Sequence, residues 1–382
     1  MIGWAVAALY GAVFVLVAYR YARRQPHLKA YAPAAHGPRL SIIIPARNEA
    51  VNIERCVRSV LSSAYAPIEI VVVDDRSTDG TAAILDGLAA APEAAGRLRV
   101  VRGSELPPGW FGKPWAVVQG FRAATGELLL FADADTRHEP ELLGRSVAAL
   151  AAEQVHLLSV IPRQEVGSFW ECLVQPQVFF VLQARVGNLN RVNRTRVPWE
   201  AIANGQFILT TRADYEAVGT HEAIKDQVAE DVALAQAYVR SGRDLFLVHA
   251  PEMMSTRMYR SFSEIVEGWS KNLALGAPMM MPPVRWLRRL APSIMWIPSL
   301  AWILPPVVWA LTGWTFAAVA TGISLATWLM IYHHERAPLQ YALLYPFGAV
   351  VVAGIMIRSA IRGGRKVEWK GRTYGSAAKL GD

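Results

Sequence analysis

The feature that most constrains this 382-residue chain is a long run without charge near its C-terminus. No Asp, Glu, Lys or Arg occurs from Ala291 to Tyr332, and Leu339 to Ile357 is a second apolar run. A helix of about 20 apolar residues is long enough to cross a bilayer. The first run therefore predicts two spanning segments with a turn near Thr312 and Gly313, and the second run predicts a third. Residues 291–357 are thus a predicted transmembrane region.

The N-terminus carries a further apolar segment, from Met1 to Tyr19, which is followed by Arg20, Arg23 and Arg24. Basic residues concentrate on the cytoplasmic side of spanning helices, so the C-terminal end of this segment is expected in the cytoplasm. A cleaved signal peptide carries its positive charge ahead of the apolar run. Because the order is reversed here, residues 1–20 are predicted to form a retained anchor.

The basic tail, residues 358–382, conflicts with a simple count of crossings. If the anchor ends in the cytoplasm, three further full crossings place this tail outside, against the positive-inside tendency. Two interpretations remain open at this point. Either one C-terminal segment is re-entrant or interfacial, or the tail breaks the rule.

Composition agrees with a membrane protein. Hydrophobic residues make up 53% of the chain and charged residues 18%, and the net charge is +8. The basic residues cluster beside apolar segments, where anionic lipid explains them, so a membrane partner is expected and a nucleic-acid partner is not. Cys56 and Cys172 lie among apolar neighbours. They are predicted to be buried, inert thiols in a reducing compartment.

Between the membrane regions, short apolar runs alternate with amphipathic helices, after a Pro- and Gly-containing linker over 21–39. Strands are predicted at 40–44, 68–73, 98–101, 128–131, 155–161, 207–211 and 245–248. Helices are predicted at 49–62, 81–90, 139–153, 227–240 and 261–275, with one more after the loop 107–115. This rhythm predicts an α/β domain with a Rossmann-like, mostly parallel sheet over residues 40–277. Residues 167–190 are predicted as an interfacial or a core helix, and 278–290 as an interfacial linker.

Acidic residues stand where predicted strands end. Asp133 and Asp135 follow the strand 128–131, and ligands of an open α/β sheet collect at the carboxyl ends of its strands. Mg²⁺ or Mn²⁺ commonly takes one or two carboxylates together with substrate phosphates. A lone Asp-x-Asp is also common in turns, so this motif alone does not decide.

Two further acidic pairs bear on that choice. Asp74 and Asp75 end the second strand, where carboxylates can accept hydrogen bonds from ribose hydroxyls. Glu230 and Asp231 begin a later helix. They either complement the helix dipole or supply a general base for an attacking hydroxyl.

Taken in order, these features resemble the family 2 glycosyltransferases with the GT-A fold, over about Leu40 to Ala277. The resemblance is carried by Pro45-x-x-Asn48-Glu49, Asp74-Asp75-x-Ser77-x-Asp79-x-Thr81, the Gly112-Lys113 loop, Asp133-Ala134-Asp135 and Glu230-Asp231. The layout of anchor, Gly-Trp-Phe-Gly-Lys-Pro-Trp loop and apolar C-terminal segments is similar to the lipid-directed branch associated with carotenoid and hopanoid glycosyltransfer. The chain also resembles the ceramide glycosyltransferases.

The resemblance implies a role for each motif residue. It implies that the pocket for the nucleotide of a UDP-sugar is lined by Pro45, Arg47, Glu49, Asp74 and Asp75. Lys113 is implied to lie near the ribose or diphosphate. Asp135, supported by Asp133, is implied to bind Mg²⁺ or Mn²⁺ on the diphosphate. Asp231 is implied to be the base that activates the acceptor for an inverting attack. Supporting or acceptor-side residues are Glu230, Gly205, Gln206, Trp269 and Lys271.

One motif departs from the family. Polysaccharide synthases carry Gln-x-x-Arg-Trp, but here only Trp269 is kept in Glu267-Gly268-Trp269-Ser270-Lys271-Asn272. Lys271 either offers its charge to the diphosphate or belongs to an interfacial Trp/Lys helix. The expected function is transfer of a hexose from a UDP-sugar to a lipid hydroxyl or carboxylate at the cytoplasmic leaflet. The alternatives are a polysaccharide synthase with its C-terminal helices as an export path, and a non-enzymatic nucleotide-sugar-binding scaffold.

Overall fold

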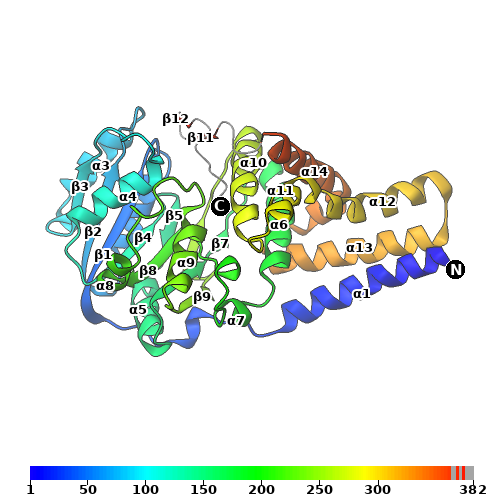
Figure 1. Cartoon of the computed structure of the whole chain (residues 1–382), viewed down its shortest axis with the longest axis horizontal. Coiled ribbons are helices and arrows are strands. Elements are labelled where there is room, and N and C mark those ends of the chain that lie inside the picture. Colours follow the sequence, from blue (N-terminus) through cyan, green and yellow to red (C-terminus); the bar gives the residue numbers. More distant parts are fainter. Residues whose placement is uncertain (363–366, 370–371, 375–382) are drawn as a thin grey trace. The chain divides into compact units, whose positions relative to one another are not determined.

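The computed structural model describes residues 1–362, 367–369 and 372–374 (Figure 1). The chain divides into two compact units. The sheet unit contains residues 26–165 and 189–258 together with the described residues of the tail. The helical unit contains residues 1–25, 166–188 and 259–362. The basic residues Arg365, Lys366 and Lys370 of the predicted tail lie outside the described residues.

Seven strands form the central sheet, in the order β3-β2-β1-β4-β8-β6-β9. Their bounds are β1 His36–Ala46, β2 Ala66–Asp74, β3 Leu98–Arg102, β4 Leu128–Ala132, β6 Leu157–Ile161, β8 Phe207–Thr211 and β9 Leu245–His249. β8 runs antiparallel to β4 and β6, whereas the other neighbours pair in parallel. The predicted α/β class with a mostly parallel sheet is confirmed.

Two smaller sheets accompany the central one. Their strands are β5 Thr136–His138, β7 Arg163–Gln164 and β10 Met254–Thr256 in one, and β11 Val367–Trp369 and β12 Arg372–Tyr374 in the other. β10 is antiparallel to β5 and parallel to β7. The short sheet joins the segments that follow β4, β6 and β9, so it fixes the path of the chain after Asp135.

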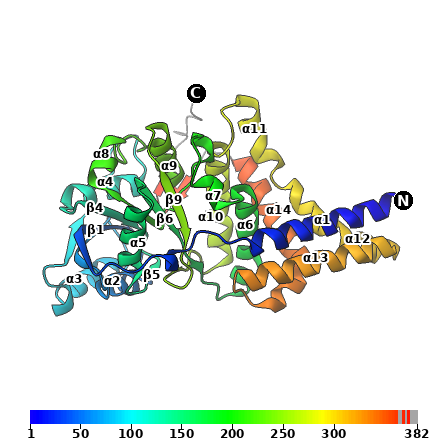
Figure 2. The ribbon, with the colours of Figure 1, turned by 90° about the horizontal axis from the view of Figure 1, so that it is seen from below.

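Helices cover both faces of the central sheet (Figure 2). Their bounds are α2 Ile53–Leu61, α3 Thr81–Ala89, α4 Gly112–Ala123, α5 Leu142–Ala152, α7 Leu189–Val192, α8 Arg212–Ala217 and α9 Glu230–Arg240, with short 3₁₀ turns η1 Leu28–Ala30, η2 Pro92–Ala94 and η3 Pro198–Glu200. α2, α3 and α5 pack on one face, where Ile42 and Ile44 are fully buried. α4 lies on the other face. A Cβ on its Gly120 would come within 2.5 Å of Ile43, so glycine lets α4 approach β1 closely.

The helical unit consists of α1 Ile2–Ala22, α6 Phe169–Val186, α10 Phe262–Met279, α11 Arg285–Ile294, α12 Ile297–Thr312, α13 Thr315–His334, η4 Leu339–Leu344 and α14 Tyr345–Arg362. Among the described residues, three segments are long and apolar enough to cross a membrane, namely Ile2–Ala22, Thr315–His334 and Leu339–Arg362. α12 is a shorter apolar helix. The turn predicted near Thr312 and Gly313 is confirmed, because α12 ends there with Gly313 in the left-handed region at φ 67°.

α6 and α10 pack among the apolar helices of this unit. α6 begins with a capping box formed by Ser168 and Glu171. One face of each helix, including Leu173 and Trp269, is buried together with Val352 of α14. The predicted range 40–277 includes both helices, and it stays a prediction for the extent of the catalytic domain.

Candidate active site

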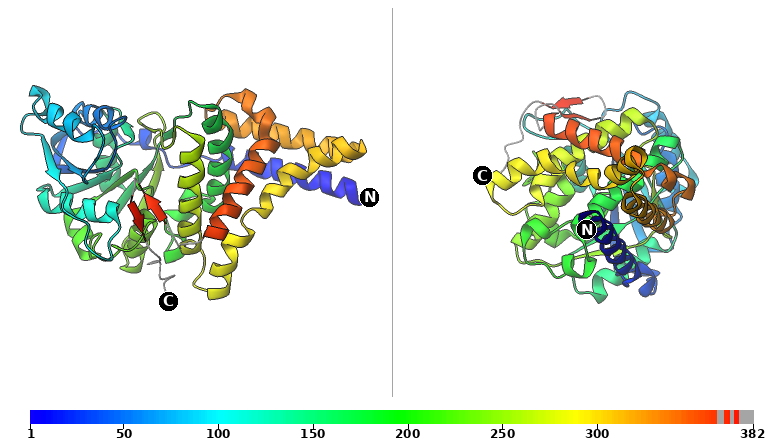
Figure 3. Two further views of the ribbon diagram at one scale, coloured as in Figure 1. Left: turned by 90° about the horizontal axis from the view of Figure 1, so that it is seen from above. Right: turned by 90° about the vertical axis from the view of Figure 1, so that its right-hand side faces the viewer.

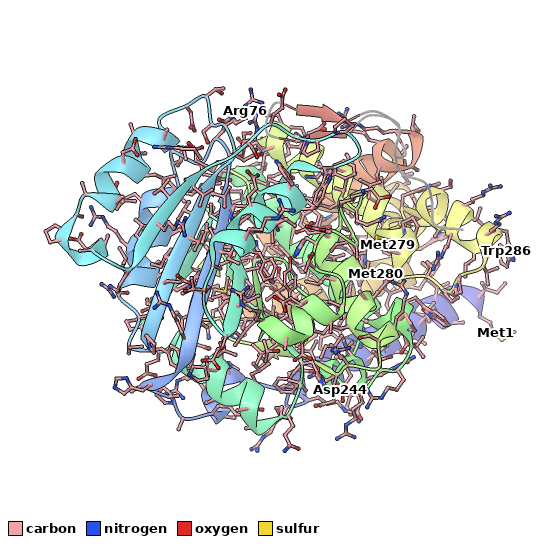
Figure 4. All side chains as sticks on the ribbon, turned by 60° about the vertical axis from the view of Figure 1, so that its left-hand side comes forward. Met1, Arg76, Asp244, Met279, Met280 and Trp286 are labelled. Atoms are coloured by element: carbon pink, nitrogen blue, oxygen red, sulfur yellow. The ribbon has the colours of Figure 1, made fainter. Side chains whose placement is uncertain are left out.

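The candidate site is built at the carboxyl end of the central sheet. β1 and β2 are in register so that Ala46 pairs with Asp74, and β4 runs parallel to β1. Figure 4 shows Arg76, just after β2, and Asp244, just before β9, at opposite ends of the sheet unit. Arg76 therefore marks the edge at which the loops carrying the predicted nucleotide residues emerge.

The loops after β1 and β2 are bound to each other. Nη1 of Arg47 donates to the carbonyl oxygens of Asp75, at 2.6 Å, and Arg76, at 2.9 Å. The Asp75 amide donates to the Ala46 carbonyl at 2.7 Å, and the Glu49 amide donates to Thr81 Oγ1 at 2.8 Å. Arg47 and Glu49 thus hold the walls of the predicted nucleotide pocket, and Pro45 lies on β1 directly before them.

Asp74 is used in the fold itself. Its Oδ2 accepts from Arg102 Nη1 at 2.8 Å, and its Oδ1 accepts from the Ser77 amide at 3.1 Å. Both contacts fix the turn after β2. The next residue, Asp75, is also acidic, and its side chain is 1% exposed. Arg102 was not predicted. It lies opposite Asp74 in the β2–β3 register, so the sheet order is the information needed to find it.

Lys113 is the centre of the most concentrated group of charges. Its Nζ lies 2.7 Å from Asp133 Oδ1 and 2.6 Å from Glu230 Oε1. These residues come from the start of α4, the end of β4 and the start of α9. Burial works to lower the pKa of Lys113, but the two carboxylates raise it above its ordinary value. The ammonium group therefore stays charged and joins three elements that are distant in sequence.

The same cluster holds Asp231. Its Oδ2 accepts from the Gly205 amide at 3.0 Å, in the loop before β8. Burial, aided by the charge of Glu230, raises the pKa of Asp231 to about 6, while Lys113 works in the opposite direction. A carboxylate with this pKa is a better proton acceptor than an ordinary Asp and is still ionised at neutral pH.

Gly205 and Gln206 occupy different positions around this carboxylate. A Cβ on Gly205 would lie 3.2 Å from Asp231 Oδ2 and 3.2 Å from Lys113 Nζ, so the backbone fits closely between the two charged groups. The buried Gln206 donates from Nε2 to Thr256 Oγ1 at 3.1 Å. Gln206 thus ties the loop before β8 to β10.

The predicted metal residues suit a hard divalent ion that is shared with a substrate. Asp133 and Asp135 offer carboxylate oxygens, and Oδ1 of Asp135 is buried. No group of three or more His, Cys, Asp or Glu residues is arranged to hold a metal ion among the described residues. Burial raises the pKa of the nearby Cys56 thiol to about 12, as expected for an inert cysteine.

Trp269 and Lys271 lie on α10 in the helical unit. The Trp269 ring is buried, and its Nε1 donates to Gln175 Oε1 of α6 at 2.7 Å. The residue that survives from the Gln-x-x-Arg-Trp motif therefore joins two helices.

His333 and His334 end α13, and His334 stacks on Tyr21 at 4.0 Å between ring centroids.

Residues 41–199 match the model of glycosyl transferase family 2. The 4,4'-diaponeurosporenoate glycosyltransferase of Staphylococcus aureus (strain MRSA252) is 29% identical over 370 residues, which is 92% of each chain. The protein of that name from Staphylococcus haemolyticus (strain JCSC1435) is 28% identical over 251 residues, and the match covers 65% of this chain and 64% of that protein.

A solved structure is also similar. A mannosyltransferase from Pyrobaculum calidifontis in complex with GDP-Man and Mn²⁺ has a TM-score of 0.54 and 20% identity, over 94% of this chain and 98% of that one. The chain combines a mostly parallel α/β sheet with apolar helices, three of which, among the described residues, are long enough to cross a membrane. The chain is thus similar to glycosyltransferase family 2 and to the staphylococcal glycosyltransferases, and its fold is GT-A.

Proposed function

We propose that this chain moves a hexose, with inversion, from a UDP-sugar to a membrane lipid. The observation that carries the proposal is the cluster in which Lys113 bridges Asp133 and Glu230 beside Asp231. A general base, a cation for the leaving group and a metal-type carboxylate are the three groups that such a transfer requires. Here they meet at the edge of the sheet where α/β proteins bind ligands.

Asp231 is the base of the proposed reaction. A bond forms between the acceptor oxygen and the anomeric carbon while the bond from that carbon to the diphosphate oxygen breaks. With a hydroxyl acceptor the hydroxyl proton passes to Asp231, whereas an ionised carboxylate attacks without proton transfer; in both cases the single in-line displacement inverts the anomeric carbon. The Gly205 amide holds Asp231 Oδ2 at 3.0 Å, so one carboxylate oxygen is oriented before the acceptor binds.

Lys113 and the Asp133–Asp135 pair face the leaving group in this proposal. A bound Mg²⁺ or Mn²⁺ would neutralise charge that builds on the diphosphate, with Asp135 and Asp133 as its protein ligands. Lys113 holds a second positive charge beside Asp133. Arg47, Glu49, Asp74 and Asp75 shape the two loops in which the uridine and ribose would lie.

The acceptor is proposed to be a long-chain lipid with a carboxylate or hydroxyl group. The names of the staphylococcal relatives denote a carotenoid carboxylate, and the apolar helices of this chain suit an acceptor dissolved in a bilayer. The basic residues at the C-terminal end of α1, Arg20 and Arg23, support placing the sheet unit on the cytoplasmic face.

The test is an assay of the full-length protein in membranes with UDP-glucose and two lipid acceptors, one carboxylate and one hydroxyl. The expected result is UDP release coupled to one sugar per lipid, with the Asp231→Asn protein inactive toward the hydroxyl and Asp226→Asn as a matched acidic control. Use of GDP-mannose in preference to UDP-sugars would contradict the donor class. Products of polymeric size would favour a polysaccharide synthase.

A further inference from the structure

Three helices of the helical unit run side by side. A Cβ on Gly3 would meet the Phe316 ring, while Tyr21 stacks on His334, so α1 and α13 are parallel along their whole length. α12 returns beside them, because Gly313 closes a tight turn between α12 and α13. The C-terminal ends of α1 and α13 and the N-terminal end of α12 therefore lie on one side.

α14 does not follow this direction. In the right-hand view of Figure 3, α1 is seen close to end-on, whereas α14 lies across the view. α14 packs along α6 and α10, and it also contacts α11 and α12. Gln177 Nε2 donates to the Tyr345 carbonyl at 3.1 Å near the start of α14, and Arg358 pairs with Glu267 at 3.1 Å near its end.

The partners of α14 are unsuited to the bilayer interior. The chain enters α6 from the sheet unit at Glu165 and returns to it at Leu189, so a single crossing by α6 would separate two parts of one compact unit. α6 also carries the buried side chains of Glu171 and Gln175. Polar side chains of this kind are rarely placed across a bilayer. A helix that packs lengthwise on α6 lies at the same depth relative to the bilayer as α6.

We propose that α14, although long and apolar enough to span, lies in the plane of the membrane surface together with α11, and that the two helices bind anionic lipid headgroups. α14 lies on the side of α6 and α10 from which α1, α12 and α13 extend (Figure 3). Its outer face is an exposed apolar stripe at helical spacing, consisting of Phe347, Val350, Ile357 and Ile361. Such a stripe on a helix lying flat enters the acyl boundary.

α11 supplies the charge for this surface. Its exposed apolar residues are Trp286 and Leu290, and Arg285 and Arg289 are exposed beside them. A short helix with Trp and Leu on one side and Arg on another is typical of the membrane interface. Arg side chains near an anionic leaflet are attracted to its headgroups, so the proposed partner is anionic lipid.

The arrangement also accounts for the basic tail. In this proposal α1, α12 and α13 cross the membrane, and a flat α14 keeps its C-terminal end on the side of Arg20. Arg358 and Arg362, at the end of α14, then lie on the side of the other basic segments, in agreement with the positive-inside tendency. Of the two interpretations that the sequence leaves open, the interfacial one follows.

Topology can be measured with single cysteines and an impermeant maleimide, because the native Cys56 and Cys172 are buried. Suitable variants are Arg24→Cys, Thr312→Cys, Gln340→Cys and Asp382→Cys. The expected result is labelling of positions 24, 340 and 382 from one side and of 312 from the other. Labelling of 382 from the side of 312 would overturn the proposal, since it requires α14 to cross.

Depth distinguishes a flat helix from a re-entrant one. Spin labels at Val350→Cys and Ile361→Cys are expected at the same shallow depth, and a label at Val307→Cys in α12 at a greater depth. A steady gradient from 350 to 361 would contradict a helix in the membrane plane. Neither measurement uses the transferase reaction, so the result is independent of the proposed activity.

The lipid preference has its own test. In vesicles of phosphatidylcholine and phosphatidylglycerol, the fraction of spin-labelled lipid immobilised by the protein is expected to be severalfold higher for phosphatidylglycerol. The Arg285→Gln/Arg289→Gln protein should lose most of this preference, whereas Arg122→Gln/Arg137→Gln, which alters exposed sheet-unit residues, should keep it. Equal immobilisation of both lipids by the unaltered protein would refute an anionic partner.

Discussion

Lys113 Nζ lies 2.6 Å from Glu230 Oε1, and Glu230 immediately precedes Asp231 in α9. One ion pair thus sets the electrostatic surroundings of the proposed base. The charge of Glu230 raises the pKa of Asp231 and that of Lys113 lowers it, after burial, which has the largest effect. The pH dependence of the reaction should report this balance.

The first prediction concerns that balance. If Asp231 must be ionised, kcat rises with pH through the pKa of about 6. Glu230→Gln removes a negative charge and leaves Lys113 less neutralised, and both changes favour the ionised form of Asp231. The acidic limb of the kcat profile should move by roughly one unit to lower pH. A pH–rate profile measures it, with the exposed Glu222→Gln as the control, and a shift to higher pH would contradict the assignment.

The second prediction separates the two acceptor classes. A carboxylic acid is already ionised at neutral pH and needs no base, whereas a hydroxyl does. Asp231→Asn should therefore reduce kcat about 10²–10⁴-fold toward a hydroxyl acceptor and far less toward a carboxylate acceptor. The KM for the donor should change little in both cases. Loss of donor binding, measured by titration with UDP-glucose, would remove Asp231 from the role of base.

The sequence predicts the helices and strands better than it predicts which of them lie next to each other. Apolar periodicity placed the strands that carry Asp74 and Asp133 and the helix that begins at Glu230, because burial on one or two faces leaves a repeating pattern. It could not pair Lys113 with Glu230 or Arg102 with Asp74, since these contacts depend on the order of strands in the sheet. Similarly, hydropathy alone predicts that α14 spans the membrane. Its proposed direction depends instead on its packing against α6 and α10.

The third prediction uses the close fit of Gly205. An alanine there would place a Cβ 3.2 Å from Asp231 Oδ2 and from Lys113 Nζ. Gly205→Ala should lower kcat roughly tenfold by displacing the carboxylate, with little change in thermal unfolding of the protein in detergent. Gly87→Ala, in α3 with nothing within 4 Å of the added Cβ, is the matched control and should keep full activity. An equal loss in both variants would point to general destabilisation.

The fourth prediction concerns the divalent ion. Asp133 and Asp135 offer two carboxylates, and substrate phosphates would complete the coordination, so the ion should bind the free protein weakly and the donor complex tightly. A chelator should abolish turnover, and Mn²⁺ or Mg²⁺ should restore it. Asp135→Asn should raise the ion concentration for half-maximal activity at least tenfold, because it removes a ligand while Lys113 still neutralises Asp133. The Asp226→Asn protein should respond to metal as the unaltered protein does. Full activity of Asp135→Ala in the presence of chelator would show that the reaction proceeds without a metal at this site.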